Sequence, residues 1–552
     1  MAIGDEQLID AGLRTGLIEA SQIDTLRQKA RKQRSSALAM VLAHYRVPVS
    51  ALYRAVAQQQ GVDFVELSVC RVDTETVKKL PASLLRRKLL LPVTRGEQRF
   101  LVVANPMERA SIEQVQRLMG QSLPLAMADV ESLRREVERS IPASTLSQAA
   151  VNPSSQEQPD VVALLDAVLR EAYLHRASDI HFLSEENGLR VRFRVDGKLR
   201  DHPIATDKNT ANGLISRVKV LSDLDIAEQR QPQDGGFSYQ LPAPFDKEFS
   251  IRVATAPTRL GERITMRVLG EQSATITLTD LGMLPDELEQ FRKAIHTPFG
   301  MILLTGPTGS GKSTTLFAAL QEINAPDVNI MTVENPIEYV MEGVSQLQTG
   351  PKVSFAGALR SFLRHDPDVL MVGEIRDHET ADVAVKAAMT GHLVFSTLHT
   401  NNAVSAVTRL IDIGCESFLI GSTMTAVIAQ RLVRRLCSHC KKPRKATETE
   451  LAEMGMAAES ETTIYDSVGC ALCQGTGFSG RLGLYETLWF NEKLARLVAR
   501  GADEETIEQE AGEASLQFLW QDGVKKIQLG WTTLNEVRNV AVRKYHQNAE
   551  LV

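Results

Sequence analysis

The sequence predicts an α/β protein built from several domains, and three observations support this. The chain has 552 residues, more than the roughly 250–300 residues that one hydrophobic core organises. The apolar run 301–304 precedes a glycine-rich loop and then residues at helical spacing, which is the order strand, loop, helix. Residues 189–197 alternate between apolar and polar side chains, as a half-buried strand does. At about 150 residues per domain, the length predicts three to four domains.

Composition and charge place the chain among ordinary globular proteins. Hydrophobic residues make up 43% of the sequence and the net charge is −6, which argues against a nucleic-acid-binding surface. The first residues lack a basic region followed by an apolar core, and no stretch approaches about 18 uninterrupted apolar residues. We therefore expect a cytoplasmic protein that contacts a membrane only through partners.

Changes in composition divide the chain into parts. The clearest linker is rich in Ser, Pro, Gln and Ala. Before it, helix-period segments give way to two strand patterns, 89–93 and 100–106. The expected parts are a helical N-terminal region, a small α/β domain, the linker, a second α/β domain and a large C-terminal domain. Their residues are 1–65, 66–140, 141–160, 161–280 and 281–552, the last with a cysteine-bearing lobe at about 436–483 and a helical end.

The glycine-rich loop fits the phosphate-binding pattern G-x-x-x-x-G-K-[ST] in full. Its place between a strand and a helix points backbone amides at a helix N-terminus, which favours a bound phosphate. Lys312 is expected to reach the β- and γ-phosphates, and the Ser313 hydroxyl to hold Mg²⁺. A chance glycine-rich turn is the alternative, but it leaves the order of strand, loop and helix unexplained. The predicted nucleotide-binding residues are Gly306, Pro307, Thr308, Gly309, Ser310, Gly311, Lys312, Ser313 and Thr314.

Carboxylates follow two further strand patterns. One pattern ends at Glu334, with Glu338 four residues later, and an apolar one leads to Glu374. Because open α/β sheets bind ligands at the carboxyl ends of their strands, we expect Glu374 beside the phosphate loop, where it would polarise an attacking water. Similar motifs place an acid before this Glu to help hold Mg²⁺, but here the residue is Gly373, so Ser313 and waters would hold the ion, with Glu334 as a further candidate. Solvated acids at a strand end are the alternative for Glu334 and Glu338.

Two histidines bracket the apolar segment 393–395. His399 lies near the carboxyl end of this strand pattern, where it would sense the γ-phosphate and report its loss. His392 precedes the segment, and both a catalytic role and a hydrogen-bonded structural role are open for it. We include both histidines among the candidate catalytic residues.

Four of the six cysteines form two C-x-x-C pairs, Cys437 with Cys440 and Cys470 with Cys473. In a reducing compartment such pairs indicate metal ligands before disulfides. Four thiolates predict a closed, tetrahedral, structural Zn²⁺ site. Redox-active C-x-x-C pairs are the alternative.

Taken together, these motifs resemble those of secretion ATPases. The succession GPTGSGKST, TVENPIEY, DPDVLMVGEIRD and TGHLVFSTLHTNNA is similar to the Walker A, Asp box, Walker B and His box of that superfamily. With ASDIH, the strand that carries Arg192 and Arg194, the PQDG segment and the four cysteines, the chain resembles an assembly ATPase of type IV pili or type II secretion. Retraction ATPases of the superfamily lack the cysteine insert and are shorter, which favours assembly.

The resemblance implies a RecA-like motor domain that uses ATP, Mg²⁺ and Zn²⁺ within a homo-hexameric ring. The ring would lie in the cytoplasm, peripheral at the inner-membrane face, and would work mechanically on a platform protein of that membrane to polymerise pilin. It also implies that Arg192 and Arg194 reach the nucleotide and neutralise the charge that develops on it. Solvated cations on an open sheet face are the alternative. Relatives usually carry an acid at the position of Asn402, and we expect its absence to be tolerated.

Other functions stay open on the sequence alone. Type II secretion ATPases share every motif quoted above. A nucleic-acid translocase on the same core conflicts with the charge of −6, so we expect no direct nucleic-acid contact. A ring that binds ATP without turnover would act as a scaffold. The N-terminal region lacks the Arg-Leu-Gly opening of the cyclic di-GMP motifs that some relatives carry, and docking on a membrane partner is its expected use.

Overall fold

A computed structural model gives the fold, and the chain divides into two compact units. The structure describes residues 3–33, 35–77, 80–140, 161–186, 188–202, 204, 206–241, 245, 247–269, 276–458 and 460–542. The linker expected at 141–160 lies outside these residues. The first unit comprises Met1–Leu269, Cys437–Cys440 and Val468–Gly477, and the second comprises Gly270–Leu436, Lys441–Ser467 and Phe478–Val552. The division into five parts that the sequence suggests stays a prediction.

The first unit begins with helices and a small mixed sheet of strand order β1-β5-β4-β3-β2. A hairpin of β3 and β4 forms its centre, and β4 runs parallel to β5. The helices are α1 (Asp5–Arg14), α2 (Ala20–Gln33), α3 (Ala37–Tyr45), α4 (Val49–Gln60), α5 (Thr74–Val77), α6 (Ala82–Lys88), α7 (Arg109–Met119) and α8 (Val130–Ser140). The strands are β1 (Asp63–Phe64), β2 (Arg71–Val72), β3 (Leu90–Arg95), β4 (Gln98–Val103) and β5 (Leu125–Met127).

A second, antiparallel sheet follows in the same unit, with the strand order β8-β7-β6-β11-β10-β9. Its apolar face packs on two helices, because the alternation along β7 buries Leu189, Val191 and Phe193 against residues of α9 and α10. The strands are β6 (Asp179–Glu185), β7 (Gly188–Val195), β8 (Lys198–His202), β9 (Gln233–Leu241), β10 (Lys247–Thr258) and β11 (Gly261–Leu269). The helices are α9 (Val161–Leu174) and α10 (Lys208–Leu221).

The cysteine-bearing loops belong to this first unit. The sequence alone predicts them in a lobe of the C-terminal domain, at about 436–483. Their grouping has a packing reason, since Ala471 is buried in one core with Leu8 and Leu52 of the N-terminal helices. In addition, Gln474 lies 2.7 Å from His175 Nδ1, just after α9.

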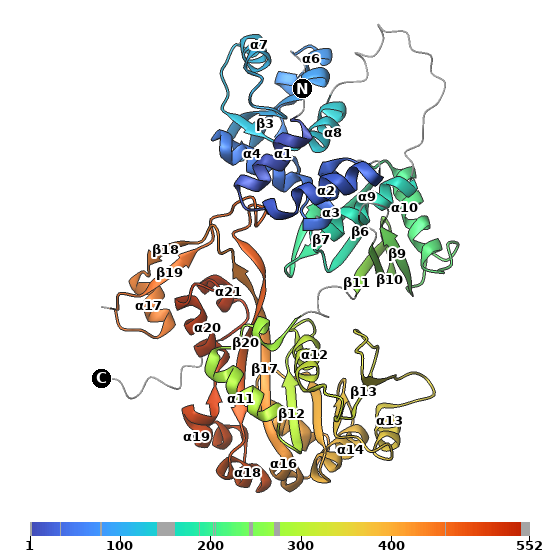
Figure 1. The fold of residues 1–552 in the computed structure, drawn as a ribbon, viewed down its shortest axis with the longest axis vertical. Helices are drawn as coiled ribbons and strands as arrows, with labels where there is room; N and C mark the ends of the chain where they lie inside the picture. Colours follow the sequence, from blue (N-terminus) through green and yellow to red (C-terminus); the bar gives the residue numbers. More distant parts are fainter. Residues whose placement is uncertain are drawn as a thin grey trace. The chain divides into compact units, whose positions relative to one another are not determined.

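The second unit contains a large sheet of order β14-β13-β15-β16-β12-β17-β20-β21 (Figure 1). The strands from β14 to β17 run parallel, and β20 and β21 are antiparallel additions. Their bounds are β12 (Gly300–Thr305), β13 (Ile330–Glu334), β14 (Val344–Gln348), β15 (Val369–Val372), β16 (Leu393–Leu398), β17 (Met424–Leu436), β20 (Phe478–Trp489) and β21 (Leu516–Gln517).

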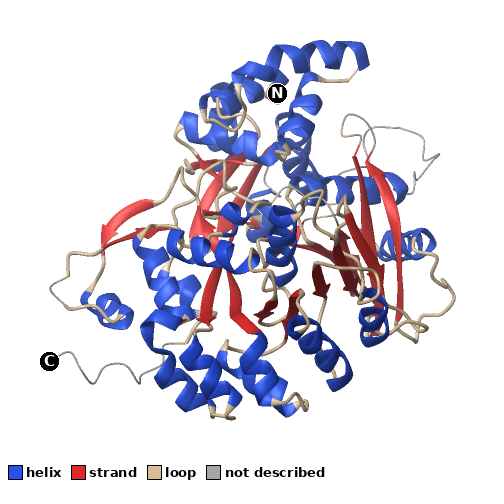
Figure 2. Ribbon diagram, turned by 60° about the horizontal axis from the view of Figure 1, so that its bottom comes forward, coloured by secondary structure: helices blue, strands red, loops and turns tan. Residues whose placement is uncertain are grey.

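Helices cover both faces of the large sheet, and Figure 2 shows strands and helices in contrasting colours. Met301 and Leu303 of β12 face one core, whereas Ile302 and Leu304 face the other. A strand buried on both faces is apolar throughout, which is why the run 301–304 has no polar residue. The helices are α11 (Pro285–Ile295), α12 (Lys312–Ile323), α13 (Phe355–Phe362), α14 (His378–Met389), α15 (Val404–Asp412), α16 (Ser417–Thr423), α18 (Glu492–Ala499), α19 (Glu504–Ser515), α20 (Leu519–Gln528) and α21 (Leu534–Arg538).

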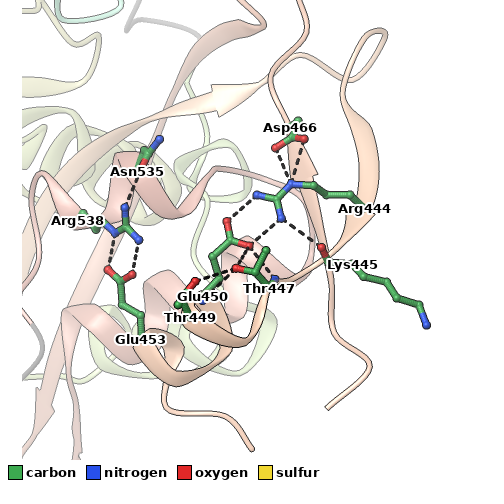
Figure 3. A network of polar contacts seen from close by, with 9 residues as sticks. All are labelled: Arg444, Lys445, Thr447, Thr449, Glu450, Glu453, Asp466, Asn535 and Arg538. Atoms are coloured by element: carbon green, nitrogen blue, oxygen red, sulfur yellow. Dashed lines mark hydrogen bonds and ion pairs between the residues drawn. The ribbon is translucent and has the colours of Figure 1, made fainter. Parts of the chain in front are cut away.

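Between the two cysteine pairs, the chain forms a small hairpin and a helix that belong to the second unit. These are β18 (Lys442–Lys445), α17 (Glu448–Met454) and β19 (Thr463–Asp466). Figure 3 shows the polar network that holds them: Arg444 bonds both Glu450 and Asp466 at 2.6–3.0 Å, and Arg538 of α21 pairs with Glu453. The network ties this segment to the C-terminal helices.

Among the described residues, no helix is long and apolar enough to cross a membrane.

Candidate functional site

The glycine-rich loop runs from the end of β12 to the first residue of α12, as the sequence predicts. Gly306 and Gly311 both have positive φ, 144° and 89°, where glycine has no steric cost. A methyl group at Gly306 would lie 2.6 Å from the carbonyl oxygen of Gln430, and one at Gly311 would lie 2.8 Å from the Gln430 side chain. The loop therefore needs glycine for its backbone conformation and for the close approach of β17.

Two polar side chains lie inside this loop. Lys312 is buried, and its Nζ donates hydrogen bonds to the carbonyl oxygens of Gly306 (2.7 Å) and Pro307 (3.2 Å). Burial lowers the pKa of Lys312 to about 8, helped by the charge of Arg431 and opposed by that of Glu374. Ser310 Oγ is buried with no hydrogen-bond partner in the described part of the chain. A buried amine of low pKa, an orphaned hydroxyl and a helix N-terminus together fit a phosphate group.

Glu374 and His399 lie together at the carboxyl edge of the sheet. Glu374 follows β15 and His399 follows β16, and a Glu374 carboxylate oxygen lies 3.5 Å from His399 Nε2. The other oxygen of Glu374 lies 2.5 Å from Arg376 Nη2. The Glu374 side chain is 15% exposed, against 49% for His399. The charge of Glu374 also acts to raise the pKa of Lys312, so the carboxylate lies within electrostatic reach of the phosphate loop.

Glu334 ends β13 with its carboxylate buried and hydrogen-bonded. Its Oε1 accepts from Thr332 Oγ1 (2.7 Å) and Gln346 Nε2 (3.0 Å). Burial raises its pKa, and the nearby charge of Glu338, an exposed residue, adds to the rise. The glycine before Glu374 also has a reason here, since a methyl at Gly373 would lie 3.3 Å from a β13 carbonyl oxygen.

The structure separates His392 from the other candidates. It precedes β16, whereas His399 follows it, and the six residues of that strand span about 20 Å. His392 Nδ1 lies 2.9 Å from the carbonyl oxygen of Ala387, and the backbone oxygen of His392 accepts from the amide of Gly300 at the start of β12. This histidine holds the amino edge of the sheet, so the structural alternative describes it better than the catalytic one.

Two residues of β17 that the sequence motifs do not indicate, Gln430 and Arg431, border the phosphate loop. Gln430 is 1% exposed, and its Oε1 accepts from Thr315 Oγ1 of α12 at 2.9 Å. A methyl at Gly306 would lie 3.0 Å from Arg431 Nη1. Nothing in the local pattern of β17 marks these residues, because only strand pairing brings them to the loop.

Asn402 stands where the resemblance to secretion ATPases implies an acid, and its contacts need no charge. Its side-chain oxygen accepts a hydrogen bond from the amide of Ser405 at 2.7 Å, and Asn supplies this acceptor at the start of a helix as well as Asp does. The next amide, that of Ala403, donates to Glu486 at 2.7 Å. The start of α15 is therefore held without a charge at this position.

Arg192 and Arg194 lie on one face of β7 in the first unit, as the alternation predicts. Arg194 Nε lies 3.6 Å from Asp179, and its Nη1 donates to the carbonyl oxygen of Gly197 at 2.9 Å. Arg192 Nε is buried without a hydrogen-bond partner among the described residues. Their approach to a nucleotide stays a prediction.

The four predicted cysteines come together in the first unit. Their sulfur atoms all lie within 4.8 Å of one another, and three pairs, Cys437–Cys470, Cys440–Cys473 and Cys470–Cys473, are 3.8 Å apart. Four thiolates about 2.3 Å from a Zn²⁺ ion in a tetrahedron would lie about 3.8 Å apart. Burial opposes ionisation of the Cys473 thiol, but amide hydrogen bonds from Cys470 and Gly477, together with hydrogen bonds from the Cys440 and Cys470 thiols, lower its pKa to about 7. The donor set and spacing fit zinc.

The comparisons with known proteins decide the family. The family described as "Type II/IV secretion system protein" matches residues 154–539, and the MshEN domain matches residues 60–145. The chain belongs to the type II/IV secretion system protein family. It is therefore an ATP hydrolase, as its motifs predict, and the resemblance stated from the sequence is confirmed.

Individual relatives extend this match. The type II secretion system ATPase E of Vibrio cholerae is 45% identical over 70% of this chain and 76% of its own length. The type IV pilus assembly ATPase PilB of Myxococcus xanthus is 36% identical over 95% of this chain and 97% of its own length. The solved structure of the Legionella pneumophila ATPase DotB shares the fold, with a TM-score of 0.52 at 22% identity over 71% of this chain and 99% of DotB.

We predict that Lys312→Ala abolishes ATP turnover together with nucleotide binding, whereas Glu374→Gln keeps binding and loses turnover. The first substitution removes the buried cation of the phosphate loop. The glutamine keeps the size of Glu374 but loses the base, an effect of about 10²–10⁴-fold. Phosphate release and the binding of a fluorescent ATP analogue measure the two effects.

A control for Glu374→Gln is Glu379→Gln, since Glu379 is an exposed acid of α14 that pairs with Arg360. It should turn over ATP at the wild-type rate. Wild-type turnover in Lys312→Ala, or equal losses in Glu374→Gln and Glu379→Gln, would contradict the assignment of the site.

Proposed function

We propose that the chain is the motor that drives type IV pilus assembly by ATP hydrolysis. The observation that carries this proposal is the length of the match to the pilus assembly ATPase, which extends over 95% of this chain and 97% of that protein and so takes in the N-terminal helices. The cysteine pairs support assembly in addition, because the resemblance associates this insert with assembly ATPases.

A second candidate is the motor of type II protein secretion. The observations in its favour are the 45% identity to the Vibrio cholerae type II secretion ATPase over 70% of this chain, and the 40% identity to the type II secretion system protein E of Pseudomonas aeruginosa over 84% of this chain and 96% of its own length. The two candidates share the chemistry of the site. They differ in the partner that the N-terminal region meets. An experiment in cells is needed to distinguish the two candidates.

The proposed chemistry is phosphoryl transfer from ATP to water. The loop amides and Lys312 bind the phosphates, and the Ser313 hydroxyl holds Mg²⁺, which neutralises phosphate charge when it is bound. Glu374 polarises the attacking water. His399, 3.5 Å from Glu374, is placed to connect that acid with the loop beyond β16. Glu334 and Glu338 lie at the next strand end, where burial raises the pKa of Glu334.

Arg192 and Arg194 are proposed to reach the transferring phosphate when units of the ring close. The support is chemical: Arg192 keeps a buried nitrogen without a hydrogen-bond partner among the described residues. An arginine in this role is worth about 10³–10⁵ in rate. Their neighbour Arg190, in contrast, is held by Asp201 through two hydrogen bonds of 2.8 Å.

We further propose that the four cysteines bind a structural Zn²⁺. The ion would be held by the thiolates of Cys437, Cys440, Cys470 and Cys473, with amide hydrogen bonds to Cys440 and Cys473 as the second layer. A closed Cys₄ set leaves no position for a reacting water. The site therefore fixes two loops of the first unit and takes no part in catalysis.

The proposed assembly is a homo-hexameric ring in the cytoplasm, peripheral at the inner membrane. Its partner would be a platform protein of that membrane. The proposal rests on family membership and is consistent with helices too short or too polar to cross a membrane among the described residues.

An allelic replacement in the source organism tests the function. With Lys312→Ala in the chromosomal copy, we expect loss of surface pili and normal protein secretion, because the motor cannot hydrolyse ATP. Pili are counted by electron microscopy and secreted proteins by gel analysis of the same cultures. Lys293→Ala, which removes an exposed lysine of α11, is the matched control. Intact pili with a lost secreted set would favour the second candidate, and no change in either would contradict both.

For the arginines, we expect that Arg192→Ala and Arg194→Ala each slow turnover by at least about tenfold while ATP binding persists. The reason is loss of charge that acts on the transferring phosphate. Steady-state ATPase assays and equilibrium binding measure the two quantities. Arg190→Ala, on the same face of β7, is the control and should keep its turnover. Full turnover in both test variants would make these arginines structural.

For zinc, we expect that a chelator removes one ion per chain and loosens the cysteine loops before the ATPase core. Structural zinc contributes on the order of 10 kcal/mol to the folding of its own site. Hydrogen exchange should rise first in 437–440 and 468–477, and metal analysis should follow the loss. Cys70→Ser, which changes a cysteine outside the cluster, should keep the ion. Uniform loosening of the chain would argue against a local structural site.

A further inference from the structure

Arg431 of β17 lies between two loops of the site. On one side, its guanidinium borders the first glycine of the phosphate loop, since a methyl group at Gly306 would lie 3.0 Å from Nη1. On the other side, its Nη2 donates a hydrogen bond of 2.8 Å to the carbonyl oxygen of Asn401. Asn401 is two residues beyond His399, so the arginine connects the phosphate loop with the loop that leaves β16.

A second contact joins the same two loops and does not involve Arg431. Thr305 is the last residue of β12, and its Oγ1 accepts a hydrogen bond of 2.9 Å from the backbone amide of Thr400. The hydroxyl groups of the two threonines lie 2.7 Å apart. The backbone course of the loop after β16 is therefore held by the threonines as well. Changing Arg431 should alter the position of this loop by a small amount without unfolding it.

Arg431 also keeps an unneutralised charge. It donates hydrogen bonds to the carbonyl oxygens of Gln430 (3.1 Å) and Asn401 (2.8 Å), and it forms no ion pair with a carboxylate within the described residues. Burial lowers its pKa, and the charge of Glu486 opposes this. An arginine stays protonated under such a shift. The side chain therefore holds a half-buried positive charge at the rim of the phosphate loop.

We propose that Arg431 is a positioning residue for ATP hydrolysis, which holds the loop of His399 against the phosphate loop. The proposal rests on the phosphate site assigned above. Arg431 donates a hydrogen bond to the backbone of the His399 loop and lies next to Gly306 of the phosphate loop, so the bound nucleotide does not need to touch it. Through this contact, His399 and its partner Glu374 keep their places relative to the phosphates that Lys312 holds.

The test uses the full-length protein with Arg431→Gln and Arg431→Lys. Glutamine keeps a hydrogen-bond donor but loses the charge and is too short to lie against both loops. Lysine keeps the charge but has no forked guanidinium group. We expect Arg431→Gln to lower kcat by about tenfold or more, in the range that loss of one charged hydrogen bond produces, with the Kd for ATP changed by less than about threefold. Arg431→Lys should recover part of kcat. Hydrogen exchange in residues 399–402 should rise in Arg431→Gln and less in Arg431→Lys.

Arg435→Gln is the matched control, because Arg435 is an exposed arginine of the same strand and should retain kcat and the exchange of 399–402. Turnover of Arg431→Gln within about twofold of wild type, or a loss of kcat that follows a general fall in Tm with no local change in exchange, would overturn the proposal. Lys312→Ala separates the two assignments: if it also keeps its turnover, the phosphate site itself is wrong, and if it is inactive while Arg431→Gln is active, only the role of Arg431 fails.

Discussion

The parallel register of β12, β15 and β16 decides where the candidate catalytic groups of the second unit lie. Thr305 pairs with Leu398, and Val372 pairs with Ser396, so these three strands end at one edge of the sheet. Each strand delivers its next residues there: the phosphate loop after β12, Glu374 after β15 and His399 after β16. The same register places His392 at the amino edge. A strand shifted by one residue would turn its buried side chains to the wrong face, so packing fixes this arrangement strongly.

The phosphate loop depends in turn on the strand behind it. Because Gly306 and Gly311 have no side chains, β17 approaches the loop closely. Gln430 and Arg431 occupy the space that two methyl groups would need. Gln430 also bonds Thr315 of α12, so β17 contacts both the beginning of the loop and the helix that follows it. The two glycines thus allow both the curvature of the loop and the close packing of β17 against it. A substitution at either glycine would push β17 away.

Local patterns in the sequence identify much of this site. The residues that reach it only through contacts between distant segments are not marked by any such pattern. The motif fixes Lys312 and its loop, and the apolar runs fix the strand ends at Glu374 and His399. Spacing alone predicts the four cysteines. By contrast, Arg431 reaches the site only through the pairing of β12 with β17, and the burial of Ala471 among N-terminal helices depends on packing between distant segments. Such contacts follow from tertiary structure, and a short sequence pattern carries no trace of them.

The balance of charge around the loop is consistent with an anionic ligand. Lys312 and Arg431 lie close enough for the charge of Arg431 to lower the pKa of Lys312. Of the nearby acids, Glu334 is buried with a raised pKa and Glu374 is engaged by Arg376 and His399. Two cations at one loop repel each other, and a bound phosphate would relieve that repulsion and favour the charged form of the lysine.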